Sequence, residues 1–498
     1  MRRPRGALAW AELALALLIT ALIVSLNVRF STAAGPLWRD EVSAVQLATR
    51  PTYAQVLRSL SLDSAPALHP TLLRLWSSPW SGGEGDGSMR ALGFGVATAL
   101  VGAIWVTGRT LDASPPLLGL ALFGVHAATL QAAGTIKPYG LGSLFIALAF
   151  GAIGRLTNAP HRSSLLYALG VAVLAVQTLY HNAPLILAVC IAGLAVAAVA
   201  RERSAALAVV ATGVAAAASL LPYTGVILSS QDWRPLTQDA FDIRWLLVRS
   251  GEVLIEGSWG LAVVWAAAAV LASYGAVRVL RRSSSSGLAA PGRRALYAVL
   301  VIVCATSLYL VFLHLSGRFP HAWQFVPVIG VVALAIDVVL AATPTLRWAR
   351  LGVAVLATVL AFPISVDRVG VRQTNVDLIA RYVHAAAQRG DLILVSPWYV
   401  GITFDRYYRG PVEWTTLPPI EDHTIHRYDL LKLQMMSREP LAPLYATPRY
   451  NARSSPGTAC GWWAAYFSRT MTNSHPSSRP HRACPPDGAT YPTRWGGR

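Results

Sequence analysis

Charged residues are scarce in this chain. They make up 13% of its 498 residues, whereas hydrophobic residues make up 54%. Soluble globular domains carry about 25% charged residues, so the composition excludes a purely soluble globule. Lysine is almost absent, with Lys137 and Lys432 as its only occurrences, and arginine therefore supplies nearly all of the net charge of +18.

Cysteine is also rare, with four residues in the chain. Cys190 and Cys304 fall inside apolar runs, where they are expected as small core residues. Cys460 and Cys484 fall in the C-terminal tail and can pair if that tail lies outside the cytoplasm. The sequence has no His/Cys cluster with zinc spacing, no glycine-rich phosphate loop and no serine nucleophile elbow. No cofactor is therefore indicated.

Long apolar runs are what the chain has in abundance. Runs of about 17 to 22 residues recur along the first 366 residues, and each is long enough to cross an apolar core about 30 Å thick. The first run is long enough to stay as an anchor instead of being cleaved as a signal peptide. The pattern predicts an all-α polytopic membrane protein with eleven transmembrane helices, at about 7–28, 89–108, 115–133, 139–154, 164–180, 184–200, 205–222, 259–278, 295–315, 323–342 and 349–366.

Arginine placement predicts the orientation of these helices. With the N-terminus inside, arginines gather in the segments on the cytoplasmic side, and the short outer connections hold only Lys137 and Arg318. This distribution explains the net charge and argues against nucleic-acid binding. We expect a multi-pass protein of the plasma (inner) membrane, with a cytoplasmic N-terminus and everything after residue 366 outside the cytoplasm.

Three regions follow from this topology. Residues 1–366 form the predicted transmembrane domain, whose outer loop 29–88 carries the acidic residues. Residues 367–452 predict a small extracytoplasmic α/β domain, with a helix at 376–388, a buried strand at 391–397 and a further helix at 402–408. Residues 453–498 are rich in Arg, Pro, Ser and Trp and lack periodicity. Two interpretations stay open for them: a disordered tail, or the out-of-frame translation of a GC-rich gene.

The first candidate site follows the first apolar run, in Trp38-Arg39-Asp40-Glu41. Acidic groups are costly near hydrocarbon, so two carboxylates close to a membrane exit suggest a functional role. Adjacent side chains on a helix point in different directions, so one carboxylate can act as a base while the other braces it. The alternative is that Asp40 only caps an interfacial helix. The two acids are adjacent and not spaced as Asp-x-Asp, so a divalent metal is not indicated.

Further candidates lie in the predicted outer segments. Asp63 and His69 precede an apolar segment and are candidates for a second acid and a polar ligand; the alternative is a polar loop that enters an interfacial helix. Lys137 can offer a point charge to an anionic phosphate, with Tyr139 beside it, or can extend into lipid headgroups. Arg318 is the other candidate cation on this side, and His181 is a candidate for the same region or an interface histidine.

The order of these motifs resembles that of the GT-C membrane glycosyltransferases, most closely the bacterial family 39 proteins related to protein O-mannosyltransferases and aminoarabinose transferases. The resemblance covers most of residues 1–410 and rests on Trp-x-Asp-Glu at 38–41, on Asp-x-x-x-x-x-His-Pro at 63–70 and on the turns at 137–139 and 317–318. One departure is that many relatives have two prolines after the histidine, where this chain has His69-Pro70-Thr71.

The resemblance implies a GT-C fold and a sugar transfer. A polyprenyl-phosphate sugar is the implied donor, membrane lipid is a partner, and the acceptor can be a protein, a lipid or a glycan. Asp40 is the implied base of an inverting reaction, Glu41 and Asp63 position or bind the acceptor, and Lys137 and Arg318 stabilise the leaving phosphate. Two other functions stay open: a lipid or polysaccharide transporter or flippase, and a non-catalytic subunit of a cell-envelope assembly.

Overall fold

The computed structural model describes residues 6–63, 65–78, 83–112, 114–229, 242–283, 289–317, 320–437 and 462–466. The chain forms two compact units. The first comprises Met1–Gly35 and Leu47–Gln373, and the second comprises Pro36–Gln46 and Thr374–Arg498. The short segment that carries Asp40 and Glu41 therefore belongs to the same unit as the C-terminal region, although more than 300 residues separate them in the sequence.

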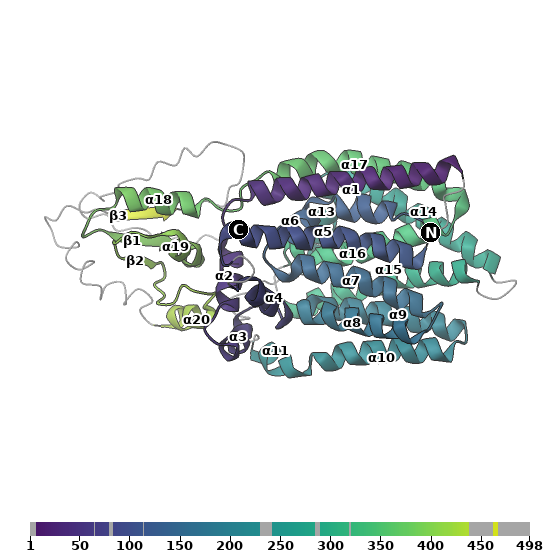
Figure 1. Cartoon of the computed structure of the whole chain (residues 1–498), viewed down its shortest axis with the longest axis horizontal. Coiled ribbons are helices and arrows are strands. Elements are labelled where there is room, and N and C mark those ends of the chain that lie inside the picture. Colours follow the sequence, from purple (N-terminus) through teal and green to yellow (C-terminus); the bar gives the residue numbers. More distant parts are fainter. Residues whose placement is uncertain are drawn as a thin grey trace. The chain divides into compact units, whose positions relative to one another are not determined.

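The first unit is a helical bundle (Figure 1). Among the described residues, nine helical segments are long and apolar enough to cross a membrane. These segments contain α1 (Ala7–Ala33), α5 (Asp86–Leu111), α7 (Pro138–Leu156), α9 (Ala183–Val199), α10 (Arg203–Ser219), α14 (Trp259–Ser283), α15 (Ala290–Ser316), α16 (Ala322–Ala341) and α17 (Arg347–Val369). The chain is thus a multi-pass membrane protein, as the sequence predicts.

Shorter helices connect the long ones. They are α3 (Tyr53–Ser59), η1 (Leu60–Leu62), α4 (Leu68–Trp76), η2 (Gly119–Gly124), α6 (Ala127–Gly134), α8 (Arg162–Thr178), η3 (Tyr180–Asn182), η4 (Leu221–Tyr223), α11 (Thr224–Ser229), α13 (Ile243–Ile255) and η6 (Pro344–Leu346). Two of the eleven predicted spans differ from the nine segments. The apolar helix α8 has only 17 residues, and the run at 115–133 is not one helix.

A polar break divides the run at 115–133. The backbone forms the π-helix η2, becomes extended at His126, and resumes as α6. Glu256 explains how the break is stabilised, because its Oε1 lies 3.1 Å from His126 Nδ1 and accepts a hydrogen bond from the Ala128 amide. Backbone that leaves the helix at membrane depth is tolerated where the surrounding protein satisfies its polar groups. The apolar composition alone did not reveal this break.

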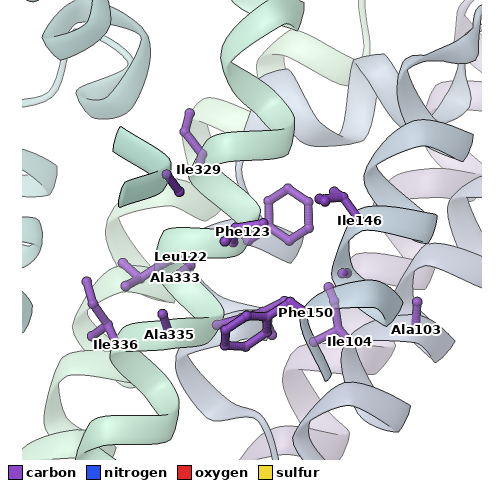
Figure 2. Packing of buried hydrophobic residues seen from close by; sticks show 14 of the residues in the cluster. Ala103, Ile104, Leu122, Phe123, Ile146, Phe150, Ile329, Ala333, Ala335 and Ile336 are labelled. Carbon is purple, nitrogen blue, oxygen red and sulfur yellow. The ribbon is translucent and has the colours of Figure 1, made fainter. Parts of the chain in front are cut away.

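The core of the bundle packs around η2. Figure 2 shows Phe123 of η2 and Phe150 of α7 among Ile104, Ile146 and Ile329 from α5, α7 and α16. Small residues allow close helix contacts: a Cβ at Gly93 would lie 2.2 Å from the Gly134 carbonyl oxygen, which places α5 against α6 at backbone distance. Such close packing is the usual basis of helix association in lipid, where helices gain little from apolar burial.

A buried charge network joins other helices of the bundle. Arg350 of α17 donates to Asp337 of α16 at 2.8 Å and lies 3.5 Å from Glu12 of α1, and Arg347 also donates to Glu12. Arg350, Asp337 and Glu12 are almost fully buried. The network joins α1, α16 and α17, and each of its charges has a partner. Removing one partner of a buried ion pair is strongly destabilising, because it leaves a buried charge uncompensated.

The second unit combines a parallel sheet with short helices. Its strands follow the order β2-β1-β3 (Figure 1), with β1 at Leu392–Ser396, β2 at Trp414–Thr416 and β3 at Trp462–Tyr466. Its helices are α2 (Arg39–Ala48, the last two residues counted with the first unit), α18 (Val376–Ala386), η7 (Trp398–Val400), α19 (Gly401–Tyr407) and α20 (Tyr428–Met436). Val383, Val395 and Phe404 lie in a core between α18, β1 and α19.

The helices and the strand that the sequence predicts at 376–408 lie at these positions. Of the segment 453–498, the structure describes only the backbone of β3. Cys460, Cys484 and the choice between a disordered and an out-of-frame tail lie outside the described residues. The predicted domain limits at 366 and 452 stay predictions.

Candidate active site

Asp40 has one oxygen held by two donors. Its Oδ1 accepts a hydrogen bond from Arg39 Nε at 2.7 Å and another from His426 Nε2 at 3.0 Å. Its Oδ2 accepts no hydrogen bond from the described residues, and 21% of the side chain is exposed. The arrangement fixes the carboxylate while leaving one of its oxygens available to a further hydrogen-bond donor.

The same contacts set the charge of Asp40. Burial alone would raise its pKa, but the hydrogen bond from His426 and the charge of Arg39 outweigh burial and hold the pKa well below its usual range. Opposite charges and hydrogen bonds favour the ionised form of a carboxyl group. Asp40 is therefore a carboxylate throughout the physiological pH range.

Glu41 has a different position from its neighbour. Its side chain is fully buried, and its Oε2 accepts a hydrogen bond from the Trp38 amide at 3.1 Å. An acid at the third position of a helix that reaches back to the amide before the first turn forms half of a capping box. Because α2 begins at Arg39, Asp40 lies inside its first turn and does not occupy the capping position. The helix-capping contact, which the sequence suggested as an alternative role for Asp40, is made by Glu41.

Aromatic rings surround the Asp40 group. The Arg39 guanidinium lies 4.7 Å from the centre of the Tyr399 ring. The His426 ring stacks on Tyr428 at 5.6 Å between ring centres and meets Trp398 edge-on at 6.4 Å. Cation–π and stacking contacts of this kind hold side chains in one orientation. The two donors to Asp40 are therefore themselves fixed.

Asp63 is paired with a lysine in the first unit. Its Oδ1 lies 3.2 Å from Lys137 Nζ, and the two side chains are 10% and 5% exposed. Lys137 directly precedes α7, whose first residue is Pro138. The lysine is buried and forms an ion pair with an acid from the segment between η1 and α4. Asp63 and Lys137 are thus brought together as one charged pair.

His69 lies near this pair but is not a cation. It is 4% exposed, and its Nδ1 has no hydrogen-bond partner among the described residues. Burial lowers its pKa to about 3, helped by the charge of Lys137 and opposed by that of Asp63. His69 is therefore neutral at physiological pH and can serve only as a neutral donor or acceptor.

Tyr139 and His181 belong to an aromatic group in the first unit. Tyr139 stacks on Trp323 with ring centres 4.0 Å apart, and His181 meets the same tryptophan edge-on at 5.4 Å. His181 Nε2 also lies 3.2 Å from Gln324 Nε2, so this ring nitrogen acts as the acceptor. Tyr139 is 7% exposed and His181 is 8% exposed. Both are brought to the start of α16.

A tyrosine positions the loop before α4. Tyr223 accepts a hydrogen bond from the Ala67 amide at 3.3 Å and donates one to Gln177 Oε1 at 2.9 Å. The loop between Asp63 and His69 is thereby tied to the residues that follow α10 and to α8.

Arg318 falls outside the described residues. Within the described part of the chain, no group of three or more His, Cys, Asp or Glu side chains is arranged to hold a metal ion.

His426 is the main site residue that the sequence motifs did not identify. It lies in Asp422-His423-Thr424-Ile425-His426-Arg427-Tyr428-Asp429, a short stretch with five titratable or charged side chains besides Tyr428. That density is a usable signal, because most of the neighbouring residues are uncharged. Its pairing with Asp40, 386 positions earlier, needs the three-dimensional structure.

Comparisons with known proteins bear on the fold. No family model and no curated protein sequence match the chain. Among solved structures, ArnT from Cupriavidus metallidurans in the apo state aligns with a TM-score of 0.52 and 14% identity, over 86% of this chain and 89% of that one. The same protein bound to undecaprenyl phosphate aligns with a TM-score of 0.50 and 13% identity, over 84% and 87%. The predicted GT-C membrane fold is thus confirmed.

Proposed function

We propose that this chain is a membrane glycosyltransferase. It moves a sugar from a polyprenyl-phosphate donor to an acceptor hydroxyl at the outer face of the plasma membrane, with inversion at the anomeric carbon and Asp40 as the base. The observation that carries the proposal is the state of Asp40: an ionised carboxylate with Oδ1 fixed and Oδ2 free of hydrogen bonds from the described residues. The proposal draws support from the fold it shares with ArnT, a protein whose structure has been solved with undecaprenyl phosphate bound.

The proposed reaction has a simple atom balance. The acceptor oxygen forms a bond to the anomeric carbon, and its proton passes to Asp40 Oδ2. The bond between the anomeric carbon and the phosphate oxygen breaks, and polyprenyl phosphate leaves with the electron pair. Attack from the face opposite the leaving group inverts the anomeric configuration.

The low pKa of Asp40 limits how it can act. A carboxylate whose pKa lies far below neutral pH is a weak base towards a free alcohol, because base strength follows the pKa. The transition state of glycosyl transfer resembles an oxocarbenium ion. The acceptor hydroxyl becomes acidic only as its oxygen bonds to that carbon. We propose that Asp40 orients the hydroxyl first and accepts its proton late.

The leaving group needs positive charge more than it needs an acid. A phosphate monoester is a stable anion, so cations that stabilise it in the transition state are sufficient. Lys137 is proposed for this role because it is a buried point charge, and Asp63 is proposed to hold it in place. Arg318 is the second proposed cation, from its place in the sequence. Glu41 is proposed to support Asp40 by bracing the first turn of α2.

A transfer assay in membranes tests the proposal. Membranes with the parent chain or with Asp40→Asn receive a panel of polyprenyl-phosphate sugars, and transfer to endogenous acceptors and the anomeric configuration of the product are measured. We expect one donor to give an inverted product with the parent chain and none with Asp40→Asn at equal expression. Near-normal transfer by Asp40→Asn would reject the assignment of the base, and no transfer from any donor would favour a transporter or an assembly subunit.

A further inference from the structure

We propose that His426 is a positioning residue for Asp40, donating from Nε2 to Oδ1 so that Oδ2 faces the acceptor hydroxyl. This inference rests on the proposed function and adds a residue from the C-terminal region to the proposed catalytic group. Neither the motifs nor the comparisons assign it a role.

The hydrogen-bond geometry favours one tautomer of His426. Nε2 lies 3.0 Å from Asp40 Oδ1, and the ring is about 10% exposed. Nδ1 is buried and has no hydrogen-bond partner among the described residues. A proton on Nδ1 would therefore have no acceptor, whereas a proton on Nε2 has Asp40. Burying a polar hydrogen without an acceptor is costly, so the tautomer with the proton on Nε2 is favoured.

The same geometry leaves neither ring nitrogen of His426 available to the proton of the acceptor hydroxyl. One ring nitrogen is engaged with Asp40, and the other is buried within the unit. Neither nitrogen is placed to take a proton directly from an acceptor hydroxyl. Asp40 Oδ2 is the atom left for that step, and His426 acts through Asp40.

Several contacts hold His426 in place. Its amide donates to Ser43 Oγ of α2 at 3.3 Å, so backbone and ring both contact the helix that carries Asp40. The next residue, Arg427, is paired with Asp422 and Asp429, at 2.5 and 2.6 Å. Tyr428 stacks on the ring. A residue fixed by so many neighbours is suited to hold another side chain in one rotamer.

Arg39 shares the contact with Oδ1 but contributes differently. Its guanidinium supplies a full charge and packs against Tyr399. The hydrogen bond from His426 supplies direction, because a ring nitrogen has one fixed N–H axis. Besides Arg39, the titratable side chains against this group are Tyr399, which lies on the Arg39 guanidinium, and Tyr428, which stacks on His426; none of them replaces the N–H of His426 at Oδ1.

Three substitutions at His426 test the role. Gln places its amide nitrogen near the position of Nε2 and can still donate, whereas Asn is too short and Phe has no donor. For the full-length chain in membranes, we expect His426→Gln to keep kcat within about threefold of the parent. We expect His426→Asn and His426→Phe to lower kcat by about 10- to 100-fold, since loss of orientation has effects of that size. The KM for the donor should change little.

The pH profile separates positioning from mere stability. Without the His426 hydrogen bond, burial raises the pKa of Asp40, so the acidic limb of kcat should move to higher pH in His426→Phe. His423→Gln is the matched control, because that histidine packs on Trp414 and does not contact Asp40; its profile should match the parent.

Two results would overturn the inference. One is a kcat and a pH profile of His426→Phe that match those of the parent chain. The other is a loss in His426→Gln as large as that in His426→Phe, which would point to proton transfer by the imidazole itself. Should His426→Phe fail to fold, His426→Gln and His426→Asn give the same comparison. Loss of activity in Asp40→Asn with no change in any His426 variant would reject this inference and leave the proposed function standing.

Discussion

Asp40 and Asp63 are both acids that the sequence singles out, yet the structure gives them different surroundings. Asp40 has one oxygen fixed by Arg39 and His426, and 21% of its side chain is exposed. Asp63 is 10% exposed and forms an ion pair with Lys137. A carboxylate with an accessible oxygen can receive a proton, whereas a buried carboxylate paired with a lysine mainly holds that lysine in place. The difference in surroundings is the reason why we propose a chemical role for the first acid and a positioning role for the second.

The largest effect is expected from breaking the Asp63 pair. Lys137→Met leaves a buried carboxylate without its lysine, which costs about 3–5 kcal/mol for a buried pair. We expect the variant to unfold at a lower temperature in detergent and to use donor poorly. Thermal unfolding and the KM for the polyprenyl-phosphate sugar measure the two effects.

A double variant separates stability from donor use. Lys137→Met combined with Asp63→Asn removes both charges and should recover much of the lost stability. Donor use should stay poor, because the point charge for the phosphate is still missing. Recovery of parental donor use in the double variant would contradict the phosphate role of Lys137.

An effect that is smaller per pH unit concerns His69, the buried histidine near the Asp63 pair. The pKa of His69 is about 3 in the folded protein, below its ordinary value of 6.5. Between these values the unfolded chain binds a proton that the folded chain does not. Stability should therefore fall as the pH drops from about 6.5 towards 3, by up to about 1.4 kcal/mol per pH unit.

Thermal unfolding across this pH range measures the slope. His69→Gln should flatten it, and the exposed His161→Gln serves as the control. An unchanged slope in His69→Gln would show that other groups produce the pH dependence.

The smallest effect is expected at Glu41, the neighbour of Asp40 in α2. Glu41→Ala removes the hydrogen bond to the Trp38 amide and should cost about 0.5–2 kcal/mol, as the loss of a helix cap does. Turnover per folded molecule should stay within several-fold of the parent. A loss of turnover in Glu41→Gln as deep as that in Asp40→Asn would move the chemistry to Glu41.

Much of the fold follows from the sequence because hydrophobic length is a local property. Apolar runs locate the long helices, and α18, β1 and α19 lie where spacing predicts them. The break at His126 did not follow, because Glu256, more than 100 residues away, stabilises it. No local pattern encodes such a contact.

The candidate site, too, follows from the sequence only where the signal is local. Asp40, Asp63 and Lys137 stand out in the sequence because charges are rare near apolar runs. Their partners do not, since the link from Asp40 to His426 crosses 386 positions. Sequence also left the positions of Asp40 and Glu41 open, whereas the start of α2 at Arg39 places them at different positions of its first turn.

The single-turnover rate of sugar transfer at saturating donor, measured for Asp40→Asn and Asp63→Asn side by side, distinguishes a base from an acid that only holds a lysine. Loss of a general base lowers the chemical step by about 10²- to 10⁴-fold, and we expect a loss in that range for Asp40→Asn. For Asp63→Asn we expect a chemical step within about tenfold of the parent. A near-parental rate in Asp40→Asn, or an equal loss in both variants, would contradict the account.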